Sequence, residues 1–112
     1  MGDDDTIRIG SRFNSSYIRA FHMLSMLLPG SAVLYYGDEI GMADGTFTSP
    51  PSPWEQKQGM RTPMQWENST DAGFANCTSS PCTDPWNNIN ADFDTVNVEV
   101  SEFNMHTIHN LV

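Results

Sequence analysis

Basic side chains are scarce in this chain of 112 residues. It carries 5 lysines and arginines against 14 aspartates and glutamates, and its formal net charge is -9. A surface of that sign repels polyanions, so we expect neither nucleic acid nor an anionic membrane as a partner. Acidity of this size is also common in secreted and surface proteins, where it mainly favours solubility.

Long hydrophobic runs are absent as well. No apolar stretch approaches the roughly 18 residues that a membrane span needs. The first residues, Met-Gly-Asp-Asp-Asp, lack the basic start and the apolar segment of a signal peptide. The hydrophobic fraction of 38% is low for a self-contained core.

Cysteine is limited to two residues, Cys77 and Cys82, in a loop rich in proline and serine. A local disulfide in an oxidising compartment is one interpretation, and two free thiols are the other. Three Asn-x-Ser/Thr sequons, at Asn14, Asn68 and Asn76, are typical of an extracellular glycoprotein, although they also arise by chance. Combined with the missing signal, these marks indicate a piece of a longer protein.

The most ordered part of the sequence is a helix followed by a strand. Asn14 can cap a helix whose apolar residues recur at three- and four-residue steps up to Leu28. Pro29 and Gly30 then predict a turn. The apolar run that ends at Tyr36 predicts a strand buried on both faces, and acidic residues follow it directly.

Beyond this unit the sequence has little periodicity. Residues 43–93 are predicted to form a long irregular loop region, rich in proline, glycine and asparagine. Asp94–Val100 alternates polar and apolar residues, which predicts a short strand or extended segment. A final helix is predicted to be capped by Ser101, with Phe103, Ile108 and Leu111 as its apolar positions. No repeat or low-complexity tract is present.

Two short stretches carry groups that are useful for binding. Arg61–Glu67 combines a guanidinium, an amide and an indole ring, which can hold sugar hydroxyls and pack on a sugar face. The alternative is a loop anchored by a buried Trp66. Asp3, Asp4 and Asp5 suggest a solvated turn, and because their spacing is not that of an EF-hand, we expect no metal site.

Several of these stretches, taken together, resemble one known family. The chain is similar to the α-glucosidase (maltase and oligo-1,6-glucosidase) branch of glycoside hydrolase family 13, over nearly its whole length and in the same order. The same branch includes the non-catalytic, maltase-like heavy subunits of heteromeric amino-acid transporters. The resemblance rests on Pro29-Gly30, Tyr35-Tyr36-Gly37-Asp38-Glu39-Ile40-Gly41-Met42, Arg61-Thr62-Pro63-Met64-Gln65-Trp66-Glu67 and Asp71-Ala72-Gly73-Phe74.

The resemblance implies an α/β fold and a place within it. Residues 1–112 are expected to be the C-terminal part of a (β/α)8 TIM barrel, from about the loop after strand seven to the start of helix eight. Asn14–Leu28 would be helix seven and Ser31–Tyr36 strand eight. A barrel needs eight strands, so strand eight would have two unpaired edges here. We therefore expect the isolated chain to be marginally stable or largely disordered.

The resemblance also implies site residues. The family's Asn-His-Asp motif is matched by Asp3-Asp4-Asp5, with Arg8 in the position of the family's arginine. Asp5 falls on the carboxylate that stabilises the transition state. Asp4 replaces a sugar-binding histidine and adds a like charge beside Asp5. Arg61 and Gln65 are the other expected substrate-binding residues.

The nucleophile and the acid/base carboxylate of the family lie in regions that this chain lacks, so the chain alone is expected to be inactive. Two functions remain open. The first is a fragment of an extracellular or cell-surface α-glucosidase acting on an oligosaccharide such as maltose, without a cofactor. The second is a fragment of a transporter heavy subunit with a membrane light subunit as partner, which the lost histidine favours. A free-standing small structural protein is a third reading, supported only by the initial Met1.

Overall fold

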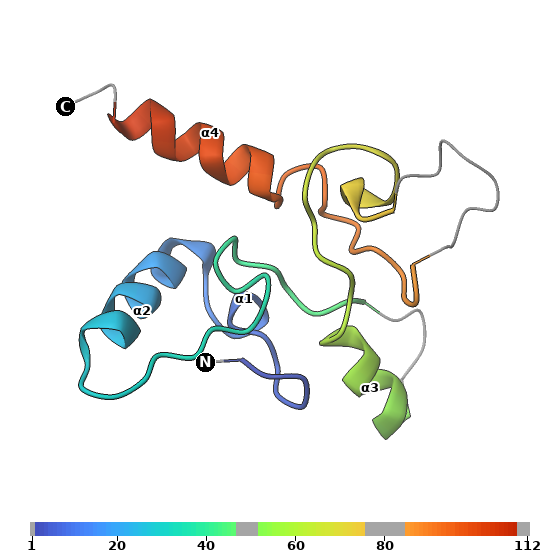
Figure 1. The fold of residues 1–112 in the computed structure, drawn as a ribbon. Helices are drawn as coiled ribbons and strands as arrows, with labels where there is room; N and C mark the ends of the chain where they lie inside the picture. The colour runs from blue at the N-terminus through green and yellow to red at the C-terminus, as the bar shows by residue number, and fades with distance from the viewer. Residues whose placement is uncertain (1, 47–51, 76–84, 110–112) are drawn as a thin grey trace.

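The computed structural model describes residues 2–46, 52–75 and 85–109. This part of the chain is helical and irregular, and contains no strand longer than an isolated bridge between Asp3 and Thr6. Helices α1 and α2 pack together, while α3 and α4 lie apart from them (Figure 1). The elements are α1 (Ile9–Arg12), α2 (Ser15–Leu27), α3 (Pro53–Gly59), the 3-10 helix η1 (Thr70–Gly73) and α4 (Val98–His109).

Helix α2 confirms the predicted helix Asn14–Leu28. The Asn14 side chain accepts a hydrogen bond from the Ser16 amide at 2.9 Å, so it caps the first turn. Leu28, in extended conformation, ends the helix just before Pro29. Because a proline disfavours helical backbone at the residue before it, the helix stops where the sequence predicts.

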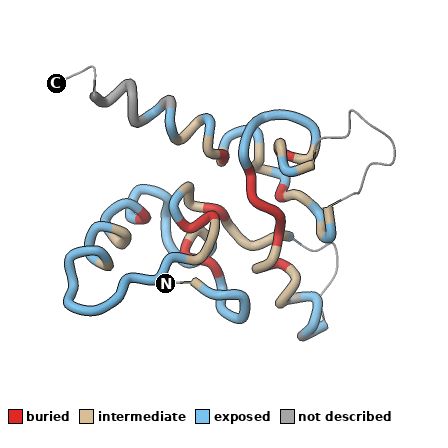
Figure 2. Tube along the Cα trace, in the orientation of Figure 1, coloured by how far each residue is buried: buried red, intermediate tan, exposed pale blue. Residues whose placement is uncertain are grey.

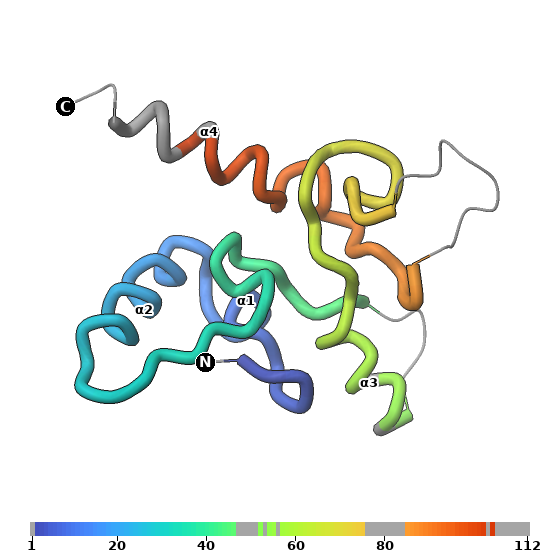
Figure 3. The backbone as a smooth tube through the Cα atoms, viewed as in Figure 1, coloured from blue at the N-terminus to red at the C-terminus, as the bar shows by residue number. Residues whose placement is uncertain are grey.

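The strand predicted at Ser31–Tyr36 does not form. Its residues belong to no ladder, and Val33 is 72% exposed. Figure 3 shows this segment returning from the end of α2 toward α1 as a single unpaired stretch. A strand buried on both faces needs neighbours on either side, and the described residues supply none. The α/β pattern is therefore not realised in the part of the chain that the structure describes.

The extended segment predicted at Asp94–Val100 is also wrong. The amides of Thr95 and Val96 donate to the Asp92 carbonyl, which closes a turn, and α4 then starts at Val98. The buried Asn97 accepts from the Val100 amide at 2.8 Å, so Asn97 performs the capping predicted for Ser101. Leu111 and the side chains of Phe103 and Ile108 lie outside the described residues.

In the described parts of region 43–93, two helical elements interrupt the irregular backbone, and neither was predicted. In α3, Ser52 and Glu55 form a reciprocal capping box around Pro53, the first helical residue. In η1, Asp71 and Ala72 have φ of 55° and 52°, which is unusual for residues other than glycine. The Ala72 carbonyl accepts from two amides of the preceding Arg61–Glu67 stretch, and these bonds hold the left-handed turn.

The interior of the described part is as polar as it is apolar. Among the described residues, the most continuous buried segment lies between α3 and η1 (Figure 2). Buried polar groups need hydrogen-bond partners, so side-chain contacts to backbone carbonyls hold much of this interior. Its buried apolar residues are Ile9, Ile18, Met42, Pro63, Met64 and Ala72, and its buried polar residues are Arg8, Asp38, Thr62, Gln65, Asn90 and Asn97.

Large apolar side chains remain on the surface around α2. Met23, Met26 and Leu27 are all more than half exposed, whereas Ile18 is the one buried residue of this helix. Such a face is normally covered by another element. None of the helices in the described ranges has both the length and the hydropathy to cross a membrane.

Candidate functional site

Three of the four residues predicted to bind or stabilise a sugar meet at one surface. One Arg61 Nη lies 3.0 Å from the Asp4 carboxylate and 3.4 Å from the Asp5 carboxylate. Lys57 Nζ lies 2.8 Å from Asp5. We call Asp4, Asp5, Lys57 and Arg61 the charge cluster. It joins the N-terminal turn to α3 and to the stretch that follows it.

The N-terminal turn fixes both carboxylates of the cluster. Asp3 accepts from the Asp5 amide at 2.9 Å, while the Asp3 amide donates to the Thr6 hydroxyl at 3.1 Å. The bond from the Asp5 amide, followed by the Thr6 hydroxyl, lowers the pKa of Asp3 below its ordinary value. Asp3 therefore shapes the turn and leaves the neighbouring carboxylates facing α3.

Arg61 holds Asp4 in two ways. Its Nε donates to the Asp4 carbonyl at 3.2 Å, in addition to the ion pair with the side chain. The Asp4 and Asp5 side chains remain 61% and 55% exposed. Exposed ion pairs are weak and screened by salt, typically about 0–1 kcal/mol each. A bound molecule with hydroxyl groups can therefore compete for these carboxylates at little cost.

Arg8, which was expected to match the family's arginine, is fully buried. Its guanidinium donates to the Tyr36 carbonyl at 2.6 Å and to the Met60 carbonyl at 3.1 Å. It also lies over two rings that contact each other, 4.7 Å from the centroid of Tyr35 and 4.6 Å from that of Tyr36. Met60 directly precedes Arg61 in the chain. Through its bond to the Met60 carbonyl, the Arg8 side chain therefore sets the distance between the N-terminal turn and the Arg61 guanidinium.

Gln65 does not join the cluster. It is fully buried, and its amide donates to the Val96 carbonyl at 2.7 Å and to Asp92 at 3.2 Å. These bonds fasten the turn before α4. The sugar-binding role predicted for Gln65 remains a prediction, and here its amide nitrogen serves the fold.

The indole rings of this region lie toward solvent. Trp66 is 49% exposed, so the alternative of a loop anchored by a buried Trp66 is wrong. Trp86 packs edge-on against Phe74, with its indole nitrogen donating to the Arg61 carbonyl at 2.9 Å. Trp54, on α3, lies with its ring centroid 6.0 Å from the Arg61 guanidinium. Exposed aromatic faces near polar groups suit the packing of a sugar ring.

Lys57 and Trp54 are the members of this surface that the sequence analysis missed. Both belong to α3, which lies in the region 43–93 that was predicted to be an irregular loop because it is rich in proline. The signal was present: a serine, a proline at the first helical position and a glutamate three residues after the serine mark a helix start. Recognising that helix would have placed Lys57 one turn before Arg61.

The other predicted sites are separate from the cluster. Asn14 and Asn68 are exposed, as a glycosylated asparagine must be. Asn76, Cys77 and Cys82 lie outside the described residues, so the third sequon and the disulfide stay predictions. Within the described ranges no group of three or more His, Cys, Asp and Glu side chains is placed to hold a metal ion.

Comparison with known proteins gives consistent matches along the chain. The family model described as "Alpha amylase, catalytic domain" matches residues 1–112. An amino acid transporter heavy chain, SLC3A1 of Mus musculus, is 39% identical over 90% of this chain and 14% of its own length. An α-glucosidase of Apis mellifera is 34% identical over 98% of this chain, and maltase 1 of Drosophila virilis 36% identical over 67%. The chain spans 14–21% of the length of these three relatives.

Proposed function

Because the chain belongs to the α-amylase catalytic-domain family, whose fold is a TIM barrel, we propose that the longer protein containing it is an α-glucosidase. That protein would hydrolyse α-glucosidic bonds in an oligosaccharide such as maltose. The observation that carries the proposal is the meeting of Asp4 and Asp5 with Arg61, which stands 56 positions after Asp5.

In this proposal each member of the cluster has a role. Asp5 accepts hydrogen bonds from sugar hydroxyls. These bonds become stronger in the transition state, because positive charge develops on the sugar there. Arg61 donates to hydroxyl oxygens and, with Lys57, balances the charge of the two carboxylates. The nucleophile and the acid/base, about 5 Å apart in a retaining enzyme, come from other parts of the longer protein.

The proposed place of the chain is the C-terminal part of the barrel, from about the loop after strand seven to the start of helix eight. Two features support it. The Ser31–Tyr36 segment is mostly apolar and belongs to no ladder, as is expected of a strand without its neighbours. The apolar side chains of α2 are uncovered, as a barrel helix would be without the rest of its barrel.

We also propose an extracellular or cell-surface location. It is supported by the exposed sequons at Asn14 and Asn68, and by the cysteine pair Cys77 and Cys82, which a local disulfide would join. Alkylation of the longer protein tests the disulfide, since labelling of these cysteines without reductant would exclude it.

One observation favours a second candidate, a heavy subunit of an amino-acid transporter that pairs with a membrane light subunit. Asp4 stands where the family has a sugar-binding histidine, and its carboxylate is held by Arg61. An ionised carboxylate accepts hydrogen bonds but donates none. A site without that donor binds a sugar less well, and a subunit without catalysis tolerates the loss.

Hydrolysis of maltose by the purified longer protein separates the two candidates. If the protein is an α-glucosidase, Asp5→Asn abolishes turnover, while Glu39→Gln, an exposed carboxylate outside the cluster, leaves it unchanged. Asp4→His should raise hydrolysis by restoring the missing donor. Unchanged turnover in Asp5→Asn refutes the role of Asp5. Absence of hydrolysis in the wild type, together with co-purification of a membrane protein, favours the heavy subunit.

A further inference from the structure

Lys57 is the only lysine in the chain, and its ammonium group lies on the carboxylate to which the proposed function assigns the transition state. Lys57 Nζ stands 2.8 Å from Asp5 Oδ1. The Arg61 guanidinium is 3.4 Å from that same oxygen, so the shorter of the two contacts belongs to Lys57. A carboxylate oxygen that already holds a cation is less available to a bound molecule. The ion pair and the proposed chemistry therefore compete for one atom.

Arg61 is engaged mainly by Asp4, which leaves Asp5 to Lys57. The Arg61 side chain donates to the Asp4 carbonyl at 3.2 Å and to the Asp4 carboxylate at 3.0 Å. Both contacts are shorter than the one that Arg61 makes with Asp5. Each carboxylate of the charge cluster therefore has its own principal counter-ion, and that of Asp5 is the Lys57 ammonium group.

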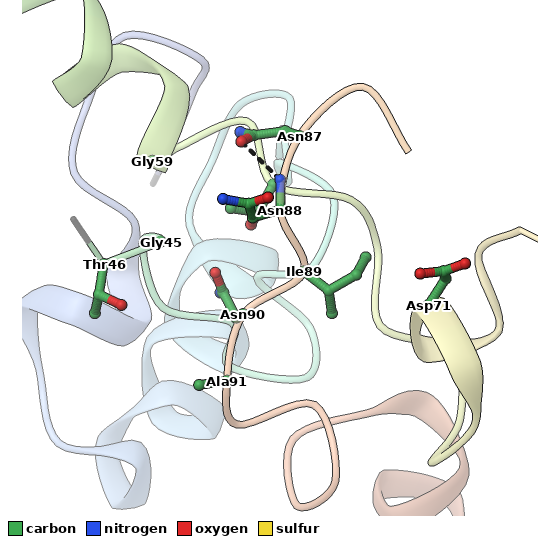
Figure 4. Close-up of a pocket in the computed structure, with 10 residues that line it drawn as sticks. Gly45, Thr46, Gly59, Asp71, Asn87, Asn88, Ile89, Asn90 and Ala91 are labelled. Atoms are coloured by element: carbon green, nitrogen blue, oxygen red, sulfur yellow. Dashed lines mark hydrogen bonds between the residues drawn. The ribbon is translucent and has the colours of Figure 1, made fainter. Parts of the chain in front are cut away.

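The end of α3 that carries Lys57 is held by two segments that are distant in sequence. The Gln58 carbonyl accepts from the Asn87 side chain at 2.6 Å, and the Gly59 carbonyl accepts from the Gly45 amide at 2.8 Å. Figure 4 shows Gly59 at the end of the helix, with Gly45 and Asn87 on neighbouring segments. Because these bonds fix the backbone directly after Lys57, its side chain starts from a point within reach of Asp5.

The charge of Lys57 opposes the transition state of the proposed reaction. Positive charge develops on the sugar in that state, and Asp5 is proposed to stabilise it. An ammonium group beside the carboxylate already balances its negative charge, and it also repels a second cation. The Lys57 and Asp5 side chains are 45% and 55% exposed, so solvent screens the pair and keeps its effect modest. We propose that Lys57 is an autoinhibitory residue, which slows hydrolysis by occupying Asp5.

This inference rests on the proposed function, and maltose hydrolysis by the purified longer protein tests it. Lys57→Met removes the cation and should raise kcat/KM about two- to fivefold, which is the effect expected of one exposed ion pair. Lys57→Arg keeps a cation and should stay close to the wild type. Arg12→Met is the matched control and should change nothing, because Arg12 is exposed and forms no ion pair within the described ranges.

Salt provides a measurement that a merely structural role of Lys57 would not affect. Raising sodium chloride from about 0.02 M to about 0.5 M shortens the Debye length from about 20 Å to about 4 Å, which weakens an exposed ion pair. The kcat/KM of the wild type should therefore rise toward that of Lys57→Met, whereas Lys57→Met should show no rise of its own. The wild-type salt profile needs no substitution, so it still decides the question if a variant fails to fold.

A cationic probe extends the test to binding without turnover. The iminosugar 1-deoxynojirimycin is positively charged when protonated and competes with Lys57 for Asp5, whereas glucose carries no charge. Calorimetric titration of the longer protein should give an affinity for the iminosugar that is about two- to fivefold higher in Lys57→Met than in the wild type. The affinity for glucose should change less, because charge and not space is what Lys57 contributes.

Two kinetic results would overturn autoinhibition: a kcat/KM of Lys57→Met no higher than that of the wild type, and a salt response shared equally by both proteins. The proposed function can fail separately. If Asp5→Asn abolishes turnover while Lys57→Met gains nothing, the hydrolase proposal stands and autoinhibition is refuted. If the wild type does not hydrolyse maltose, the iminosugar titration decides, and an unchanged affinity in Lys57→Met refutes autoinhibition as well.

Discussion

Replacing Arg8 by methionine should destabilise the chain more than any surface substitution. The guanidinium makes two hydrogen bonds to backbone carbonyls, those of Tyr36 and Met60. Hydrogen bonds to charged groups contribute about 1.5–3 kcal/mol each, so the pair sums to about 3–6 kcal/mol. One Arg8 nitrogen is buried without a partner among the described residues, which offsets part of that sum. We therefore expect a loss of about 3 kcal/mol.

A loss of that size is large for this molecule. Proteins are typically stable by about 5–15 kcal/mol, and a small, polar interior favours the low end of that range. The Arg8→Met chain should thus unfold at a much lower urea concentration, as followed by the helical circular dichroism signal. Arg8→Lys should fall between the two, because an ammonium reaches fewer acceptors than a planar guanidinium.

Arg12→Met is the control, since Arg12 is exposed at the end of α1. It should change the free energy of unfolding by no more than about 0.5 kcal/mol. If Arg8→Met lies within about 1 kcal/mol of the wild type, or equals Arg12→Met, then the buried guanidinium does not join the segments and the reasoning is refuted.

Three further predictions concern single residues. Asn14→Ala removes the cap of α2 and should cost about 1 kcal/mol in urea unfolding, whereas Asn14→Asp should not; equal effects would contradict the cap. Gly10→Ala should unfold the chain, because a Cβ there would overlap the carbonyl oxygens of Gly41 and Met42, and near-native circular dichroism would disprove that contact. Burial, followed by the hydrogen bond with Tyr36, raises the pKa of Tyr35 to about 12. Its neutral form therefore stabilises the fold fully below pH 10, and that contribution is lost as the pH rises toward about 12. Absorbance at alkaline pH should show one late tyrosine that Tyr35→Phe removes; a wild-type titration complete near pH 10 would contradict it.

Local signals in the sequence predicted local structure well. The cap at Asn14 and the stop at Pro29 both lie within a few residues of the helix they delimit, and α2 follows them. The strand at Ser31–Tyr36 depended on partner strands that the described residues do not supply, and without them an apolar run has nothing to pair with. Residues 94–97 alternate like a strand, yet a local turn and an asparagine cap start a helix instead.

The site shows the same division. Asp4, Asp5 and Arg61 were identified from motifs, and the structure places them in contact, while their roles stay predictions. Lys57 was missed because the prolines around α3 predicted an irregular loop. The capping box of Ser52 and Glu55 was the signal that could have predicted this helix. The burial of Gln65 could not be read from the sequence, since it depends on a turn near Asp92 that forms 27 positions later.

The bonds of Arg8 also set an order of events during synthesis. Its acceptors at Tyr36 and Met60 lie 28 and 52 positions further along the chain. At a translation rate of about 5–20 residues per second, Met60 is made roughly 3–10 s after Arg8. Helix α2, whose bonds are local, can form within microseconds of leaving the ribosome. Helix α2 can therefore be formed already while Arg8 and the N-terminal turn still lack their contact with the segment around Met60, which is synthesised later.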